Sequence, residues 1–234
     1  MSVFSGLIDN IYSNIFYSGR FFLYMKGLYN TLLIAFFAAI VGIAIGTLVA
    51  IIKVYSAESR GLRPLNFLCD IYLTVVRGTP MAVQLLIMYY VVFGAAPATF
   101  RIPVAVIAFG VNSGAYVAEI IRAGIQSIDR GQTEAGRSLG LTKNMTMRYI
   151  IMPQAVKNIL PALFNEFITL VKETAIVSLI AVPDLTYAAT LVRSRTFNAY
   201  VPLFFIALVY LTIVVGLTAL QKRLERRLAA SDQR

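Results

Sequence analysis

The sequence contains no histidine and only one cysteine, Cys69, among its 234 residues. These absences exclude a Cys/His zinc site, a Ser-His-Asp triad and a disulfide framework. We expect the lone Cys69 to be a small buried apolar residue. Charged residues are also scarce: they make up 14% of the chain, against about 25% in a typical soluble domain.

Apolar residues take the place of the missing charge. Hydrophobic residues make up 59% of the chain, and its mean hydropathy is +0.75. A single soluble core of this size cannot bury so much apolar surface, so we expect an all-α integral membrane protein in contact with the lipid bilayer. The net charge of +10 is then better explained by basic cytoplasmic loops than by nucleic acid, which we do not expect as a partner.

Five stretches are long and apolar enough to span a bilayer, which takes about 20 residues. They cover residues 28–52, 67–93, 102–121, 161–182 and 201–220, and together they define a transmembrane domain over 28–220. The preceding segment, 1–27, is aromatic and lacks the pattern of a signal peptide, so we expect a short interfacial helix there. A cytoplasmic basic tail is expected over 221–234.

The distribution of basic residues predicts the orientation. With five spans, one set of connections carries fourteen Lys and Arg residues and the opposite set carries five. Because the richer side faces the cytoplasm, we expect the N-terminus outside and the C-terminus inside.

The longest connection, 122–160, is expected to be a cytoplasmic loop with two short helices. The first covers Thr133 to Leu139 and stops at Gly140, a residue suited to the left-handed conformation. Thr142 can cap a second helix that runs to about Ile151, where Pro153 ends it or bends the chain. Such a loop either presents its helices to a partner or is a solvated connector.

This loop resembles the cytoplasmic loop of ABC-importer permeases, which is patterned E-A-A, three residues, G, nine residues, I-x-L-P. The matching positions are Glu134, Ala135, Gly136, Gly140, Ile150, Met152 and Pro153. Two positions depart from the pattern: Gly136 stands for Ala, and Met152 stands for Leu. The Met keeps the volume, while the Gly loosens the short helix by up to about 1 kcal/mol.

Other stretches are similar to permeases of the polar amino-acid uptake family. They are Val76 to Pro80 followed by Gln84, Asn112 to Tyr116, Ala118 to Gly124, Asn165 with Glu166, and Leu170 to Thr174. The resemblance implies a type I ABC-importer permease in a bacterial inner membrane, paired with a second copy or a paralogue. It also implies a dimer of ABC ATPase subunits and an extracytoplasmic amino-acid-binding protein as partners.

The resemblance also assigns the ATPase contact. The coupling residues would be Glu134, Ala135, Gly136, Arg137, Ser138, Leu139, Gly140 and Leu141. The chain has no Gly-x4-Gly-Lys-Ser/Thr phosphate loop, so we do not expect it to be an enzyme. No cofactor is expected in this chain, and ATP and magnesium would belong to the partner ATPase.

Ionisable residues in the fourth span are the main substrate candidates, because charges inside a bilayer usually face a cavity or a partner. At 100° per residue, Asn165, Thr169 and Lys172 share one stripe, and Glu166 and Glu173 share an adjacent one. This set suits a zwitterion, with Lys172 toward the carboxylate and Glu166 or Glu173 toward the ammonium. Alternatively, Lys172 pairs with Glu166, Glu173 or Asp70, and no substrate is involved.

Two further substrate candidates lie in the second and third spans. Asn112 in the third span lines a cavity or bonds across helices. Arg77 precedes a break at Gly78 to Pro80, where it lies in the pathway, satisfies the freed carbonyls or holds the dimer partner.

Two local contacts are also predicted from spacing. Glu119 is expected to pair with Arg122 one turn later on the same helix. Gly42 and Gly46 indicate close helix packing.

The function predicted from these features is translocation of a polar amino acid by alternating access, driven by partner ATPases through the 134–153 loop. The main alternative is an ATP-independent carrier or channel for small polar solutes. An intramembrane enzyme using Ser113 and Lys172, and a membrane scaffold, are weaker alternatives.

Overall fold

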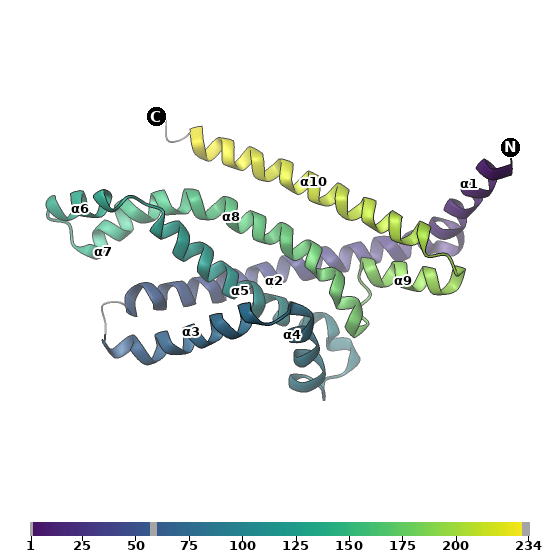
Figure 1. Ribbon diagram of the computed structural model, residues 1–234, viewed down its shortest axis with the longest axis horizontal. Helices are drawn as coiled ribbons and strands as arrows, with labels where there is room; N and C mark the ends of the chain where they lie inside the picture. The colour runs from purple at the N-terminus through teal and green to yellow at the C-terminus, as the bar shows by residue number, and fades with distance from the viewer. Residues whose placement is uncertain (1, 57–59, 231–234) are drawn as a thin grey trace.

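The computed structural model describes residues 2–56 and 60–230, and all regular elements in that part of the chain are helical (Figure 1). The helices are α1 (Ser2–Ile15), α2 (Arg20–Ser56), α3 (Arg63–Gly78), α4 (Met81–Ile87), α5 (Arg101–Gln126), α6 (Arg130–Ser138), α7 (Lys143–Thr146), α8 (Met152–Glu173), α9 (Leu185–Thr196) and α10 (Tyr200–Ala230). Among the described residues, three helices are long and apolar enough to cross a membrane. The number is five if each of two bent helix pairs counts as one span.

Close packing of α2 against α5 forms the centre of the molecule, and small residues allow it. A Cβ added at Gly46 would come within 2.5 Å of Val117 Cγ1, and one at Gly42 within 3.0 Å of Ser113. On α5, a Cβ added at Gly110 would likewise come within 2.5 Å of Val41 Cγ1. The helix-packing role predicted for Gly42 and Gly46 is therefore confirmed.

The second predicted span, 67–93, is sharply broken. The α3 helix and the segment Met81–Val92 meet at 110°. The break follows from Thr79 and Pro80, whose backbones are extended, and from the proline's missing N–H. Cys69 on α3 is buried, as predicted.

The fourth predicted span begins earlier than expected. The sequence predicts that Pro153 ends or bends the preceding helix, but α7 continues through the π-helical turn Met147–Ile151 into α8. Pro153 occupies the first turn of α8, and the wider π turn shifts the carbonyl with which its ring would clash. Beyond Glu173 the chain tightens into the 3₁₀ segment Thr174–Ile180.

The α9 helix lies between the fourth and fifth predicted spans, where the sequence predicts only a connection. Asp184 caps it by accepting hydrogen bonds from the N–H groups of Thr186 and Tyr187, at 3.0 and 2.8 Å. The α2 helix crosses directly over this turn: a Cβ at Gly27 would lie 2.6 Å from the Asp184 carbonyl oxygen. Asn30 of α2 adds a 2.8 Å bond to the carbonyl of Pro183.

The N-terminal boundary also differs from the prediction. The α2 helix starts at Arg20, eight residues before the predicted span at Leu28, because nothing in residues 20–27 interrupts the helix. A 3₁₀ turn with Ser18 and Gly19 at positive φ separates it from α1. The aromatic side chains Tyr12, Phe16, Tyr17 and Phe22 in this region are exposed.

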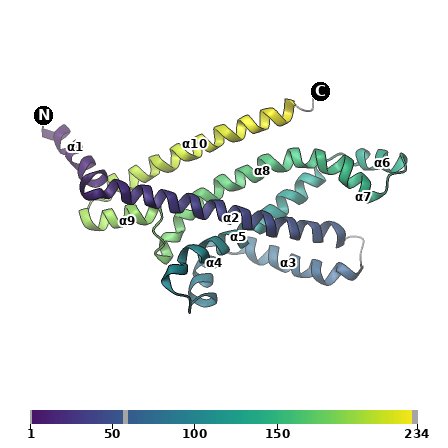
Figure 2. The same cartoon turned by 180° about the vertical axis from the view of Figure 1, so that it is seen from behind.

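Most of the predicted cytoplasmic segments lie at one end of the molecule. Figure 1 shows α6, α7, the C-terminal end of α2, the start of α3 and the C-terminal end of α10 at the left, with α1 and α9 at the right. Figure 2 shows the same arrangement from behind, with α10 diverging from α2 and α8 toward its C-terminus. The described segments that carry the predicted cytoplasmic basic residues are thus gathered at the end opposite α1, while Arg234 lies outside the described residues.

Candidate functional site

Gln84 of α4 holds the break in the second span. Its Nε2 donates to the carbonyl oxygens of Val76 and Thr79, at 2.7 and 3.1 Å, and to Thr79 Oγ1 at 2.9 Å. Its Oε1 accepts a 3.0 Å bond from Nδ2 of buried Asn112 on α5. Asn112 thus bonds across helices, and Gln84 satisfies the carbonyls that the sequence analysis assigned to Arg77.

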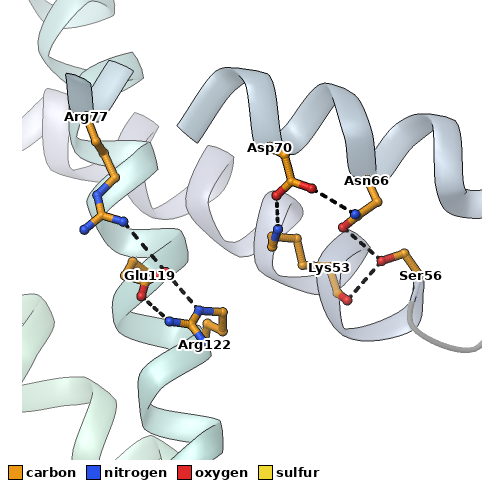
Figure 3. Close-up of polar contacts among 7 residues, drawn as sticks. All are labelled: Lys53, Ser56, Asn66, Asp70, Arg77, Glu119 and Arg122. Carbon is orange, nitrogen blue, oxygen red and sulfur yellow. Dashed lines mark hydrogen bonds and ion pairs between the residues drawn. The ribbon is translucent and has the colours of Figure 1, made fainter. Parts of the chain in front are cut away.

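Arg77 instead turns toward α5. Its Nη1 lies 3.9 Å from Glu119 Oε2, and its guanidinium carbon lies 5.8 Å from the centre of the Tyr116 ring. Glu119 also accepts a 2.9 Å bond from Arg122 Nε, which confirms the predicted pair (Figure 3). Arg77 therefore takes part in a partly exposed ionic cluster that joins α3 to α5.

A second ionic cluster joins α2 to α3. Lys53 pairs with Asp70, whose other oxygen accepts a 3.0 Å bond from Asn66 Nδ2 (Figure 3). Asn66 in turn contacts Ser56 at 3.1 Å. The structure does not bring Lys172 to Asp70: the ion pair of Asp70 among the described residues is with Lys53.

Glu166 on α8 faces α5 and the apolar side of the bundle. Its Oε1 accepts a 2.7 Å bond from Oγ of Ser113, which is 1% exposed. Both residues line an otherwise apolar cleft of about 360 Å³ between α2, α8 and α10. The half-buried carboxylate thus has a hydroxyl donor from the neighbouring helix as its partner.

The other substrate candidates on α8 differ from Glu166 in their exposure. Asn165, Lys172 and Glu173 are exposed, and Thr169 is half-buried. Within the described part of the chain, no carboxylate oxygen lies within 4.0 Å of Lys172, so the structure does not bring it to Glu166. The roles predicted for the seven substrate candidates stay predictions. These residues are Arg77, Asn112, Asn165, Glu166, Thr169, Lys172 and Glu173.

The predicted coupling residues, 134–141, lie in α6 and in the turn that joins it to α7, and the two helices form a hairpin. Asp129 caps α6 through a 2.7 Å bond from the Gly131 N–H, and Thr142 caps α7 through a 3.3 Å bond from the Met145 N–H. Gly140, at φ +83°, stops α6 as predicted. The Gly140 N–H donates to the Arg137 carbonyl, and the Leu141 N–H donates to the Gly136 carbonyl. These are the two hydrogen bonds of a Schellman motif.

Gly136 has a packing role that the sequence did not reveal. A Cβ there would lie 2.8 Å from Thr146 Cγ2 and 2.9 Å from Ile150 Cδ1. The glycine therefore lets α6 lie against α7 and the π turn, in addition to the loosening expected from its helix propensity. Outside this contact the hairpin is open: Glu134, Arg137 and Leu139 are exposed, and Leu139 retains 80% of its surface.

Sequence reasoning left two residues out of the site. Gln84 appeared only as part of a motif, although an amide four residues after Pro80 is well placed to reach carbonyls freed by the proline. Ser113 is predicted to allow close helix approach or a hydrogen bond across helices, and it is the nucleophile of the weaker enzyme alternative, but the sequence does not indicate Glu166 as its partner. Among the described residues, no three His, Cys, Asp or Glu side chains are grouped so as to hold a metal ion.

A family model described as "Binding-protein-dependent transport system inner membrane component" matches residues 42–230. The chain belongs to this family. It is therefore a membrane permease of the ABC transporter class, whose members are not themselves ATPases. The family also implies an ATPase partner and a substrate-binding protein.

Relatives of this permease include two with named substrates. The arginine transport system permease protein ArtQ of Bacillus subtilis (strain 168) is 41% identical over 212 residues, which cover 89% of this chain and 93% of the relative. The putative glutamine transport system permease protein GlnP of Rickettsia bellii (strain RML369-C) is 38% identical over 220 residues. The match covers 92% of this chain and 97% of that protein.

Solved structures confirm the type I permease fold. One, described as an amino acid ABC transporter with histidines, matches with a TM-score of 0.81 and 45% identity over 88% of this chain and 94% of the other. An inward-facing methionine ABC transporter, MetNI, matches with a TM-score of 0.76 at 19% identity, over 90% of this chain and 98% of the other. The second likeness concerns the fold alone.

Proposed function

We propose that this permease is the transmembrane subunit of an ATP-driven importer that moves a polar amino acid across the bacterial inner membrane by alternating access. The names of the relatives, which are permeases for arginine and glutamine, support the substrate class. Two copies, or one copy and a paralogue, would enclose the pathway. An extracytoplasmic binding protein would deliver the substrate, and two ATPase subunits would bind ATP and magnesium.

The α6–α7 hairpin is the observation that carries this proposal. Its exposed face contains a carboxylate, a guanidinium and a bare leucine, which suit a protein partner better than a solvated connector. Both ends of the hairpin lead directly into spanning helices, α5 on one side and α8 on the other. These helices pack so closely that a Cβ at Gly124 would come within 2.3 Å of Ile159 Cγ1. Movement of the hairpin would therefore move α5 and α8 together.

The exposed stripe of α8 is the proposed substrate surface. Lys172 would bind the carboxylate of the amino acid, and Glu173 would bind its ammonium, because Glu166 lies in the cleft and is bonded to Ser113 instead. Lys172 has no ion-pair partner among the described residues, so its charge is available for a ligand or for the second subunit. Asn165 and Thr169 share its stripe, whereas Asn112 would act by keeping Gln84 and the broken span in position.

The orientation follows from the charge distribution. The end with α6, α7 and the C-terminal part of α10 would lie at the cytoplasmic surface, and the N-terminus would lie outside. This places the hairpin where a cytoplasmic ATPase can reach it.

Co-purification from membranes tests the proposal. The tagged chain is expressed with its native partners, and mass spectrometry identifies the bound proteins for wild type, Glu134→Arg and the control Glu225→Arg. Glu225 lies on α10, away from the hairpin, and its reversal makes the same change of charge. An ATPase that binds wild type and the control but not Glu134→Arg supports the proposal. Absence of an ATPase from all three samples would favour an ATP-independent carrier or channel.

A further inference from the structure

Two adjacent apolar clefts lie between α2, α8 and α10. They have volumes of about 690 and 360 Å³ and share Phe36 and Phe167 in their walls. The α10 side is open because a Cβ added at Gly216 would meet no atom within 4 Å. The polar side chains Ser113 and Glu166 in the smaller cleft bind each other, so the remaining wall there is apolar.

The clefts extend along α10 for about the depth of one lipid leaflet. Their α10 walls run from Thr212 to Leu224, which are twelve helical steps apart, or about 18 Å along the helix. Half of a bilayer's hydrocarbon core is about 15 Å. A space of this length is sufficient for an acyl chain lying along the helix.

Two arginines continue the cleft-lining stripe beyond the clefts. At 100° per residue, Arg223 and Arg227 lie within about 20° of Gly216 around the α10 axis. Lys222 and Arg226 lie roughly 80° to 120° away, on the side opposite the cleft-lining leucines.

The two arginines are available for an anion. Both are exposed, and no hydrogen bond or ion pair of either is present among the described residues. The acidic side chain of this helix end, Glu225, lies about 180° from Gly216 and accepts a 3.0 Å bond from Gln221. The mouth of the clefts is therefore positive.

We propose that these clefts bind the acyl chains of an anionic phospholipid whose phosphate is held by Arg223 and Arg227. The apolar walls match the chains, and the two free guanidinium groups match the phosphate in charge and in bidentate geometry. The lipid would fill the gap between α10 and the α2–α8 pair. The assignment of this lipid to the inner leaflet rests on the orientation given in the proposed function.

Native mass spectrometry of the detergent-solubilised full chain tests this proposal. Binding of phosphatidylglycerol is compared with that of phosphatidylcholine with the same acyl chains. In the double variant Arg223→Gln/Arg227→Gln, phosphatidylglycerol binding should weaken about thirtyfold, equivalent to about 2 kcal/mol for two basic residues. The matched control Lys222→Gln/Arg226→Gln removes the same charge from another face of α10 and should weaken binding less than about threefold.

A second variant tests the clefts themselves. Gly216→Phe fills the larger cleft from the open side without changing any charge, and it should also abolish selective binding. Equal losses in the two double variants, or full binding by Gly216→Phe, would overturn the proposal. So would efficient cross-linking of two chains through Gly216→Cys in a Cys69→Ser background, because the clefts would then be a subunit interface.

The readout separates this inference from the proposed function. Lipid binding by the chain needs no ATPase, so Glu134→Arg should bind phosphatidylglycerol normally. Loss of ATPase association with retained lipid binding leaves the lipid site intact. Unchanged ATPase association without any lipid binding contradicts only the lipid site.

Discussion

Replacing Gln84 by leucine should lower the free energy of unfolding by about 1 to 3 kcal/mol. Two of its four hydrogen bonds end on buried groups, the Val76 carbonyl and the Asn112 amide. Interhelical bonds in membrane proteins contribute about 0.6 kcal/mol on average and up to about 1.7 kcal/mol each, so two lost bonds give this range. The two bonds to exposed Thr79 add little, because water can replace them.

Reversible unfolding in mixed detergent micelles measures this effect. The control Thr79→Val removes only the exposed hydroxyl contacts and should cost less than about 0.5 kcal/mol. In a double-mutant cycle with Asn112→Leu, the coupling to Gln84 should be about 0.6 kcal/mol or more. A Gln84→Leu protein as stable as wild type, or strict additivity in the cycle, would refute the assignment of Gln84 as the group that holds the broken span.

Three further substitutions test other parts of the structure. Gly140→Ala should destabilise the α6–α7 hairpin by about 1 to 2 kcal/mol, because Gly140 has a φ of +83°. Gly140→Asn should destabilise it less, because asparagine tolerates this conformation better. Amide exchange over 134–141 should therefore be faster in the Ala variant alone. Gly46→Leu should lower the unfolding free energy by about 1 to 3 kcal/mol by overpacking against Val117. Gly216→Leu enters open space and improves helix propensity by up to about 1 kcal/mol, so it should not lower the unfolding free energy. Lys172→Met should abolish transport but change the unfolding free energy by less than about 0.5 kcal/mol, because Lys172 is exposed and has no ion-pair partner among the described residues. Transport and unfolding assays on one preparation separate the two effects.

Local signals in the sequence predicted much of the secondary structure. The caps at Thr142 and Gly140 and the pair of Glu119 with Arg122 depend on neighbours within one or two helical turns, so spacing alone indicated them. The packing of Gly42 and Gly46 was also readable, because small residues four apart leave a flat helix face.

Features that depend on contacts distant in sequence were not predictable. The pairing of Asp70 with Lys53 rather than Lys172, and that of Ser113 with Glu166, is decided by which helices become neighbours. Pro153 by itself predicts a helix end or a bend. The π turn before it accommodates the proline ring, so the helix continues into α8.

The α9 helix was missed for a different reason. It has only twelve residues, with two arginines in its last turn, so it contains no apolar run long enough to indicate a membrane span. Its signal was local but weak: Asp184 is a good cap, and Leu185, Ala188, Ala189 and Val192 recur with helical spacing and are all buried.

Uptake by proteoliposomes tests the central claim most directly. The permease is reconstituted with its ATPase and binding protein, and labelled polar amino acids are supplied with or without ATP. The account predicts uptake that requires both ATP and the ATPase, and that is lost in Glu134→Arg together with ATPase binding. Uptake at the same rate without ATP or without the ATPase would contradict it.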